Sequence, residues 1–423
     1  MQQPFRRRIL IVVAGISIMA TLQIERTNRF VALAQDSGKA SERRPLVLDR
    51  APARMVSDPN PVFSGITVDA DRGEVYMTND KESASPSVVV YPTQFPPSDK
   101  IMEPRRRISG PQAHLALPCG VAVSPEAQEM YTVTGDGQQL NVFPLNGNGD
   151  IKPARELTVP HASGGVYLDV KHDELFLTTE HANKIGVYRR AAQGDEDPVR
   201  FIQGPNTGLA DPHGIYVDAD RNEIFVTNHG HWRKTQPGEG FALHGDSKLA
   251  QMRGSFSHAG PVEPLGPSSG KFLPPSLTVY SRTVQGDVAP LRTIQGPHTR
   301  LNESVGISRD PVSGQIVVAN TGDNSVLFFD ANASGDAAPT RVLQGPATNM
   351  KGPTGVAVDA KDNELWVTSW DNHMTLVFPR TVQGNVAPTR YIRSAPKDAP
   401  LATMGRLGAV EYDPKRKEIL MPN

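Results

Sequence analysis

The chain has 423 residues, of which 38% are hydrophobic and 21% charged, and this is the composition of a globular protein. Its 37 glycines and 37 prolines fall short of a disordered composition and predict many turns between short strands. The single cysteine, Cys119, excludes an intrachain disulfide and a cysteine-rich zinc site, and the absence of a concentrated basic segment argues against nucleic acid as a partner.

Residues 1–34 have the pattern of a signal peptide, with an uncleaved N-terminal anchor as the alternative. Three arginines, Arg6 to Arg8, precede an apolar run from Ile9 to Leu22 that is short for a membrane span, and Ala32-Leu33-Ala34 fits a cleavage site. Cleavage there would remove five Arg and one Glu and leave 39 basic and 44 acidic residues, a net charge of −5. We therefore expect an exported protein, periplasmic or extracellular, that contacts a membrane only if the anchor is retained. Residues 35–45 are expected to form a flexible lead.

One sequence phrase recurs through the rest of the chain, first as SGITVDADRGEVYMTND from Ser64. Each copy contains two runs rich in Ile, Val, Tyr and Thr, separated by a turn of the DxxxxE type, and these runs predict two strands. A third run and, after a Gly/Asp/Pro turn, a fourth complete a unit of the size of one propeller blade. The seven glycines that mark the copies are Gly65, Gly120, Gly165, Gly214, Gly306, Gly355 and Gly408.

The two ends of the repeat region predict how the ring closes. The last copy stops after two strands at Asn423, whereas PLVLDRAPARMV near the start matches only a third and a fourth strand. We therefore expect an all-β, seven-bladed β-propeller over residues 46–423, closed by N- and C-terminal strands that share one blade, with six blades as the alternative. An open solenoid would need capping repeats. The Asp and Glu that recur at the turn in most copies are expected to be architectural.

The repeat resembles the NHL and YVTN classes of propeller repeat, on the residues PHGIYVD with EIFVTNHG and PTGVAVD with ELWVTSWDN. The resemblance implies the propeller fold, and it leaves open whether the protein is an enzyme, a binding platform or a scaffold.

Positions that differ between blades are the candidates for function. The residue before the repeat glycine and the loop after the second strand are expected on one face, near the central channel. They predict a ligand-binding face that includes Asp80, Cys119, Glu180, His181, Asp323, Trp370 and Asp371. Cys119 is interpreted as a small buried residue, with a nucleophile activated by His213 as the alternative.

The fourth blade carries an insertion over residues 229–275, rich in Gly, Pro and Ser, which we expect to emerge on the same face as a lid. His213, His229 and His231 lie at this end of the blade and form a candidate site for one divalent metal ion, zinc or calcium. The amidating lyases of NHL type hold zinc with histidines from several blades, but the positions equivalent to His213 are not histidines here. Gluconolactonase-like propellers use Glu, Asn and Asp, for which Glu180, Asn228 and Asp371 are the matching candidates.

The sequence thus leaves two hypotheses. The first is an exported, non-catalytic propeller that binds an unidentified ligand or protein at the mouth of the channel. The alternative is a metal-dependent hydrolase, lactonase or lyase that uses His213 and the loops of the fourth blade.

Overall fold

The computed structural model describes residues 60–80, 85–234, 270–399, 411–413 and 418–420, and the side chains of residues 231–272 and of those beyond 399 lie outside this description. The predicted signal peptide and lead therefore lie outside the described residues, as do most of the blade-four insertion and the segment PLVLDRAPARMV. No helix in the described part of the chain is long and apolar enough to span a membrane.

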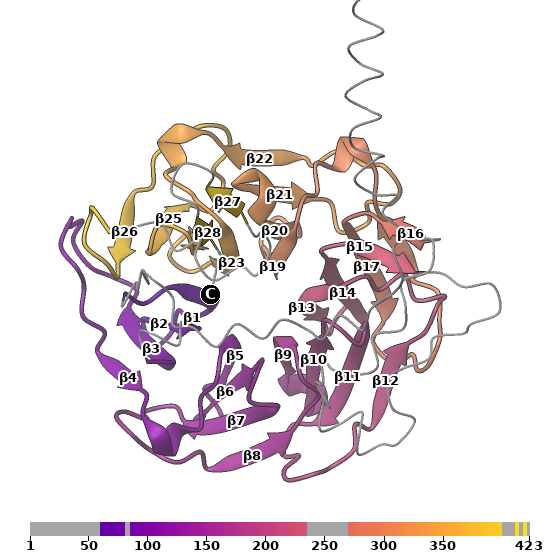
Figure 1. The fold of residues 1–423 in the computed structure, drawn as a ribbon, viewed down its shortest axis with the longest axis horizontal. Helices are drawn as coiled ribbons and strands as arrows, with labels where there is room; N and C mark the ends of the chain where they lie inside the picture. The colour runs from indigo at the N-terminus through magenta and orange to yellow at the C-terminus, as the bar shows by residue number, and fades with distance from the viewer. Residues whose placement is uncertain (1–59, 81–84, 235–269, 400–410, 414–417, 421–423) are drawn as a thin grey trace, which may run out of the picture. The chain divides into compact units, whose positions relative to one another are not determined.

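Six four-stranded antiparallel sheets are arranged as the blades of a ring (Figure 1). The strands of blades 1 to 3 are β1 Phe63–Asp69, β2 Glu74–Asn79, β3 Ser87–Pro92 and β4 Arg106–Ile108; β5 Pro118–Ser124, β6 Glu129–Thr134, β7 Gln139–Pro144 and β8 Arg155–Thr158; β9 Ser163–Asp169, β10 Glu174–Thr179, β11 Lys184–Arg189 and β12 Arg200–Gln203. Those of blades 4 to 6 are β13 Pro212–Asp218, β14 Glu223–Asn228, β17 Ser276–Ser281 and β18 Arg292–Ile294; β19 Ser304–Arg309, β20 Ile316–Asn320, β21 Ser325–Phe329 and β22 Arg341–Gln344; β23 Pro353–Asp359, β24 Glu364–Ser369, β25 Met374–Pro379 and β26 Arg390–Arg393.

Short elements connect or extend the blades. In blade 4, a hairpin of β15 His231–Lys234 and β16 Gly270–Leu273 lies between the second and third strands, at the two ends of the predicted insertion. Five single-turn 3-10 helices occupy loops of the described chain: η2 Pro111–Ala113, η3 Val170–His172, η4 Pro297–Thr299, η5 Thr321–Asp323 and η6 Pro346–Thr348.

The ring closes with six blades, so the prediction of seven is wrong and its six-bladed alternative is confirmed. The first strands of blades 1 and 6, β1 and β23, pack against each other, and each blade takes its four strands from one stretch of chain. The last copy of the repeat contains β27 Glu411–Asp413 and β28 Glu418–Leu420, which pair with each other and with no strand of the six described blades. A half repeat has the same sequence pattern as the start of a blade, and the pattern alone does not show whether it joins the ring.

Apolar packing between adjacent blades holds the ring together. The buried core divides into six clusters, and each cluster fills one of the six seams between blades. The seam between blades 6 and 1 is filled like the others, with Phe63 and Tyr91 of blade 1 packed near Trp366 of blade 6. The ring is therefore closed by side-chain packing and does not need an exchanged strand.

The repeat glycine lies in a bulge of the innermost strand, where the register with the second strand shifts. A Cβ atom at Gly165 would overlap the carbonyl oxygen of His213 in the next blade, and the same overlap occurs at the other five glycines of the ring. A threonine of the second strand reinforces this contact, since Thr178 Oγ1 accepts from Gly165 N and donates to the His213 carbonyl. Glycine is thus required here by the close approach of two backbones.

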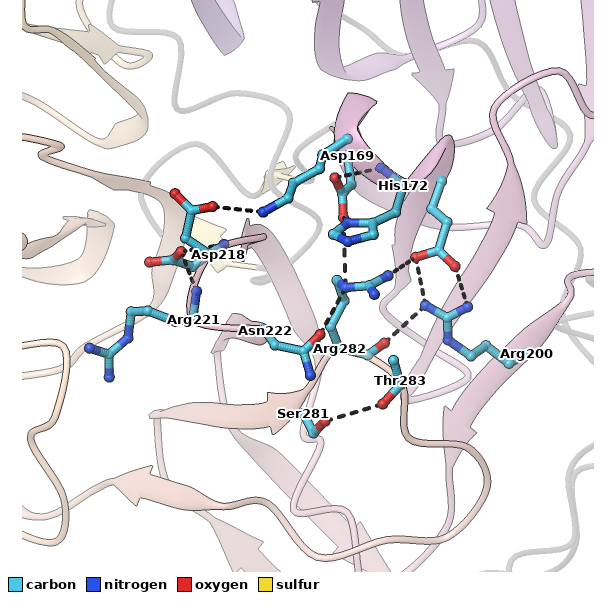
Figure 2. Close-up of polar contacts among 12 residues, drawn as sticks. Asp169, His172, Arg200, Asp218, Arg221, Asn222, Ser281, Arg282 and Thr283 are labelled. Atoms are coloured by element: carbon cyan, nitrogen blue, oxygen red, sulfur yellow. Dashed lines mark hydrogen bonds and ion pairs between the residues drawn. The ribbon is translucent and has the colours of Figure 1, made fainter.

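The recurring carboxylates have the architectural roles predicted for them. The aspartates accept backbone N–H groups of their own turn, as Asp169 does from His172 N at 3.2 Å. In five blades the glutamate that opens the second strand pairs with an arginine of the fourth strand, and that arginine also donates to a carbonyl of the next blade. Arg200 is an example: it binds Glu174 and the carbonyl oxygen of Arg282, and Figure 2 shows Arg200 and Arg282 converging between blades 3 and 4.

Candidate functional site

A cavity of about 660 Å³ lies at the end of the central channel where the innermost strands begin. The backbone of all six repeat glycines contributes to its wall. Because each innermost strand enters the wall at the same register, the side chains that face the cavity come from equivalent positions of the repeat.

Two of these positions supply most of the lining. The residue before the repeat glycine lines the cavity in all six blades: Ser64, Cys119, Gly164, His213, Val305 and Thr354. The first residue after the second strand lines it in five blades: Asp80, Glu180, His229, Thr321 and Trp370. Blade 2 has Gly135 at this position, where no side chain is available.

A third repeat position, three residues before the repeat glycine, adds two carboxylates to this region. Asp211 and Glu303 occupy it with left-handed φ angles of 57° and 50°. The carbonyl of Asp211 accepts the backbone N–H of His229 at 3.0 Å, and that of Glu303 accepts the N–H of Thr321 at 3.2 Å. This turn places the Asp211 side chain beside His213 and His229.

Asp211, His213 and His229 form a cluster whose potential ligand atoms all lie within 4.8 Å of one another. Asp211 Oδ2 is 3.8 Å from His213 Nε2 and 3.7 Å from His229 Nδ1, and the centroids of the two imidazole rings are 3.8 Å apart. Ligand atoms about 2.1 Å from a tetrahedral zinc ion are about 3.4 Å apart. The three side chains therefore fit a zinc-like ion after small adjustments, and two imidazoles favour such an ion over calcium, which prefers oxygen ligands.

Glu180 supports His213 from the other side of its ring. Its Oε1 lies 3.3 Å from His213 Nδ1, so the carboxylate can hold the Nδ1–H tautomer and leave Nε2 directed toward Asp211. Metal-binding histidines commonly have a carboxylate in this place.

Burial and neighbouring charges shift the pKa values of Glu180 and His213. Burial raises the pKa of Glu180. Burial alone would lower the pKa of His213, but the nearby Glu180 and Asp211 carboxylates outweigh it, and the pKa of His213 is raised. The same negative field that favours a protonated imidazole also attracts a divalent cation.

A second acidic group within the described residues, Asp359, Asp362 and Glu364, also has its oxygens close enough together for a metal site. Asp359 accepts the backbone N–H groups of Lys361 and Asp362, and Glu364 pairs with Arg390. This group is the turn and ion pair found in the other blades, and we assign it no metal.

Cys119 does not have the surroundings of a nucleophile. Its Sγ lies 3.3 Å from the carbonyl oxygen of Leu117, and burial, followed by the charges of Glu180 and Asp80, raises the pKa of the thiol well above its usual value. Such a thiol remains protonated at neutral pH. The imidazole of His213 instead contacts Glu180, Asp211 and His229. Cys119 is half-buried in the cavity wall, and its role as a small packing residue stays a prediction.

Asp80 and Trp370 meet at the seam between blades 1 and 6. The Trp370 indole Nε1–H donates to the Asp80 carboxylate, at 3.0 Å from Oδ1 and 3.3 Å from Oδ2. Both residues line the cavity, so the contact fixes an aromatic ring and a carboxylate in its wall.

The structure brings together six of the sequence-predicted site residues at the cavity: Asp80, Cys119, Glu180, His213, His229 and Trp370. His181, Asp323 and Asp371 follow the lining position by one or two residues and are not part of the described lining. His181 instead stacks on His161, with ring centroids 5.8 Å apart. His231 lies in β15, and its side chain is outside the described part.

The set Glu180, Asn228 and Asp371 is not assembled at the cavity. Asn228 is buried within blade 4, where its side chain accepts from Ala210 N and donates to Thr278 Oγ1, each at 3.0 Å. Sequence reasoning missed Asp211 and Glu303, because it compared blades only at the residue before the repeat glycine and in the loop after the second strand. Comparison three residues upstream of the glycine reveals both carboxylates.

These observations define the chain as a six-bladed β-propeller with a cavity at one mouth of its channel, lined by apolar residues and a few polar side chains. No known family matches the chain, and no curated protein matches it, so the NHL or YVTN type of the repeat stays a prediction.

Solved structures with a similar course of the chain include a candidate 6-phosphogluconolactonase from Bacteroides uniformis, with 14% identity, a TM-score of 0.49 and coverage of 82% of this chain and 88% of that one. The periplasmic gluconolactonase PpgL of Pseudomonas aeruginosa has 12% identity, a TM-score of 0.48 and coverage of 80% and 86%. A chain of Kuenenia stuttgartiensis hydrazine synthase has 13% identity, a TM-score of 0.45 and coverage of 80% and 99%. None of the activities of these proteins is transferred to this chain on this likeness.

Proposed function

We propose that the protein is a metal-dependent hydrolase that acts on small esters or lactones at the mouth of the channel. The observation that carries the proposal is the cluster of Asp211, His213 and His229, of which the two histidines, together with Glu180 behind His213, line a cavity of about 660 Å³. A divalent ion bound by the three side chains would supply a Lewis acid.

The residues of the chain would share the remaining work. Glu180 holds the His213 ring in one orientation, and its carboxylate lines the cavity, where it can accept a proton from water. The cavity leaves room for a small molecule beside the cluster. Esters and lactones fit this arrangement, because their hydrolysis needs a polarised carbonyl and a proton acceptor near water and requires no redox cofactor.

The first experiment is metal analysis of the purified full-length protein and of the variants His213→Ala and His229→Ala. We expect about one zinc-class ion per wild-type chain and a loss of 10-fold or more in each variant. His161→Ala is the matched control, because His161 is a histidine of a neighbouring blade that is not part of the cluster.

The second experiment is hydrolysis of p-nitrophenyl acetate and glucono-1,5-lactone by the same proteins. Metal-dependent turnover that is lost in His213→Ala would support the hydrolase. Wild-type protein without stoichiometric metal would refute the metal site. Bound metal without turnover would refute the hydrolase and leave a metal-containing binding protein.

Export is a separate part of the proposal and is supported by the arginine-led apolar run in residues 1–34. Expression of the full chain followed by N-terminal sequencing tests it. A new N-terminus after Ala34 is expected, and protein that keeps Met1 in the cytoplasmic fraction would refute export.

A further inference from the structure

The side chains that line the cavity form two layers. The layer at the mouth contains the residue before each repeat glycine and the first residue after the second strand, and it includes His213, His229 and Glu180. The lower layer is the residue after each repeat glycine. It lies two positions further along the innermost strand than His213 does in its own strand, and therefore about 7 Å deeper in the channel. The glycine between the two layers adds no side chain that would separate them.

The lower layer is aliphatic in every blade. Its six members, all β-branched and all part of the cavity lining, are Ile66, Val121, Val166, Ile215, Ile307 and Val356. The layer at the mouth, in contrast, has different side chains from one blade to the next. One aliphatic residue from each blade therefore forms an apolar belt around the channel, directly below the candidate metal cluster.

The packing of the seams between blades holds the belt in place. Val121, Ile215 and Val356 are buried members of three of the core clusters, and the other three residues pack, partly buried, against the remaining three clusters. β-branched side chains have few rotamers, so the belt keeps its shape before a ligand arrives, and this reduces the entropic cost of binding. Seam packing explains why these residues are aliphatic, and the edge that each one exposes gives the cavity an apolar lower wall.

A molecule that reaches from the cluster into the belt must differ in polarity along its length. The cluster suits a polar group such as the carbonyl of an ester or lactone. The side chains of the belt offer no hydrogen-bond donor or acceptor, so a hydroxyl group placed among them would lose its bonds to water without replacement. Each methylene group that leaves water for the belt should instead strengthen binding about fourfold.

We propose that the apolar belt binds the alkyl chain of the substrate, so that the protein prefers esters and lactones with an unbranched alkyl chain of medium length over hydroxylated ones. The inference rests on the proposed function, in that hydrolysis takes place at the cluster. There, water adds to the acyl carbon, the acyl C–O bond breaks, and the acid and the alcohol are released. What the belt adds is the apolar chain of the substrate and its direction into the channel.

The kinetic test compares p-nitrophenyl acetate, butyrate and hexanoate as substrates of the full-length protein. We expect kcat/KM to rise by about 100-fold from acetate to hexanoate, because four additional methylene groups enter the belt. Among lactones, δ-decalactone should be hydrolysed faster than glucono-1,5-lactone. A kcat/KM that is constant or falls with chain length, or a preference for glucono-1,5-lactone, would overturn the belt as a substrate site.

Val121→Thr places a hydroxyl group in the belt at nearly constant side-chain volume. It should lower the preference for hexanoate over acetate by about 5-fold. Val123→Thr is the matched control, because Val123 lies in the same strand, packs against the same core cluster and does not belong to the described cavity lining. The preference should be unchanged in this variant, and an equal effect of the two substitutions would overturn the proposal. Val166→Thr makes the same change at a half-buried member of the belt and replaces Val121→Thr if that variant does not fold.

A binding test separates the belt from the hydrolase. Butanol and hexanol, which have no bond to hydrolyse at the cluster, are titrated into wild type, His213→Ala and both valine variants in saturation-transfer NMR experiments. We expect Kd to be about 10-fold lower for hexanol than for butanol in wild type and in His213→Ala. Hexanol should bind about 5-fold more weakly to Val121→Thr than to Val123→Thr.

These results would support the belt even if no ester is hydrolysed, and the absence of turnover would then refute the hydrolase alone. Binding that does not depend on chain length, or equal binding of hexanol to the two valine variants, would overturn the belt whether or not hydrolysis is found.

Discussion

Replacing Gly165 by alanine tests the contact that builds both the ring and the site. The new Cβ would overlap the carbonyl oxygen of His213 and would lie 2.7 Å from Thr178 Oγ1. The innermost strands of blades 3 and 4 must then separate. Overpacking of this kind costs about 1–3 kcal/mol. The two hydrogen bonds of Thr178 would weaken as well, at about 1 kcal/mol each. We expect a loss of about 3–5 kcal/mol in the free energy of unfolding.

The measurement is equilibrium unfolding in urea, read by far-UV circular dichroism, with metal content measured on the folded variant. Gly194→Ala is the control, because Gly194 has a φ of 62° and an added Cβ would meet no heavy atom within 4 Å, so the variant has only the left-handed backbone cost of about 1–2 kcal/mol. The strand separation also moves His213, so metal affinity should fall in Gly165→Ala and not in Gly194→Ala. Equal destabilisation by the two substitutions would refute the reasoning, since it would show that blades 3 and 4 are not in close backbone contact.

Three further predictions concern the scaffold and the thiol. The hydrogen bond from Arg106 holds the pKa of Glu74 at about 2, below the ordinary value of 4.5. The ionised Glu74 therefore contributes up to about 3 kcal/mol to the free energy of unfolding above pH 4.5, and this contribution is lost as the pH falls toward 2. The difference in stability between wild type and Glu74→Gln, measured by urea unfolding, should narrow over that range, and a constant difference would contradict the ion pair. Blade 5 has Gln315 where the other blades have glutamate, and the Gln315 side chain accepts a hydrogen bond from Arg341 at 2.8 Å. Gln315→Glu should therefore stabilise the fold by about 0.5–1 kcal/mol in the same assay. Destabilisation would show that the site tolerates no added charge. Cys119→Ala should keep its metal content and its turnover, and wild-type protein should react slowly with Ellman's reagent at pH 7; rapid labelling with loss of turnover would restore the nucleophile hypothesis.

The blades could be predicted from sequence because a strand pattern, a turn and a glycine recur together. The number of blades could not, because Gly408 marks a copy of the phrase as clearly as Gly355 does. What decides the count is which innermost strands pack against each other, and β1 packs against β23. That contact joins segments from the two ends of the repeat region and leaves no periodic signal within either strand.

Part of the cavity lining could be predicted from the sequence. Glu180, His213 and His229 were found because they differ from their counterparts in other blades, and they line the cavity. Asp371 was grouped with them because it is polar and follows Trp370, but the loop directs only the first residue after the strand toward the channel. Asp211 was missed because its repeat position was not compared between blades. Its approach to His213 depends in addition on a left-handed turn, which the sequence Asp-Pro-His does not specify.

The backbone and the side chain of His213 have separate structural roles. Its backbone carbonyl receives the Thr178 hydrogen bond and the close approach of Gly165, and any amino acid supplies a carbonyl. Its side chain faces the cavity, where the equivalent positions hold serine, cysteine, glycine, valine and threonine. The side chains that line the cavity can therefore be replaced in one blade at a time without altering the backbone contacts between blades. A saturation library at these equivalent positions would be expected to remain largely folded, so this propeller is a practical starting point for evolving new specificities.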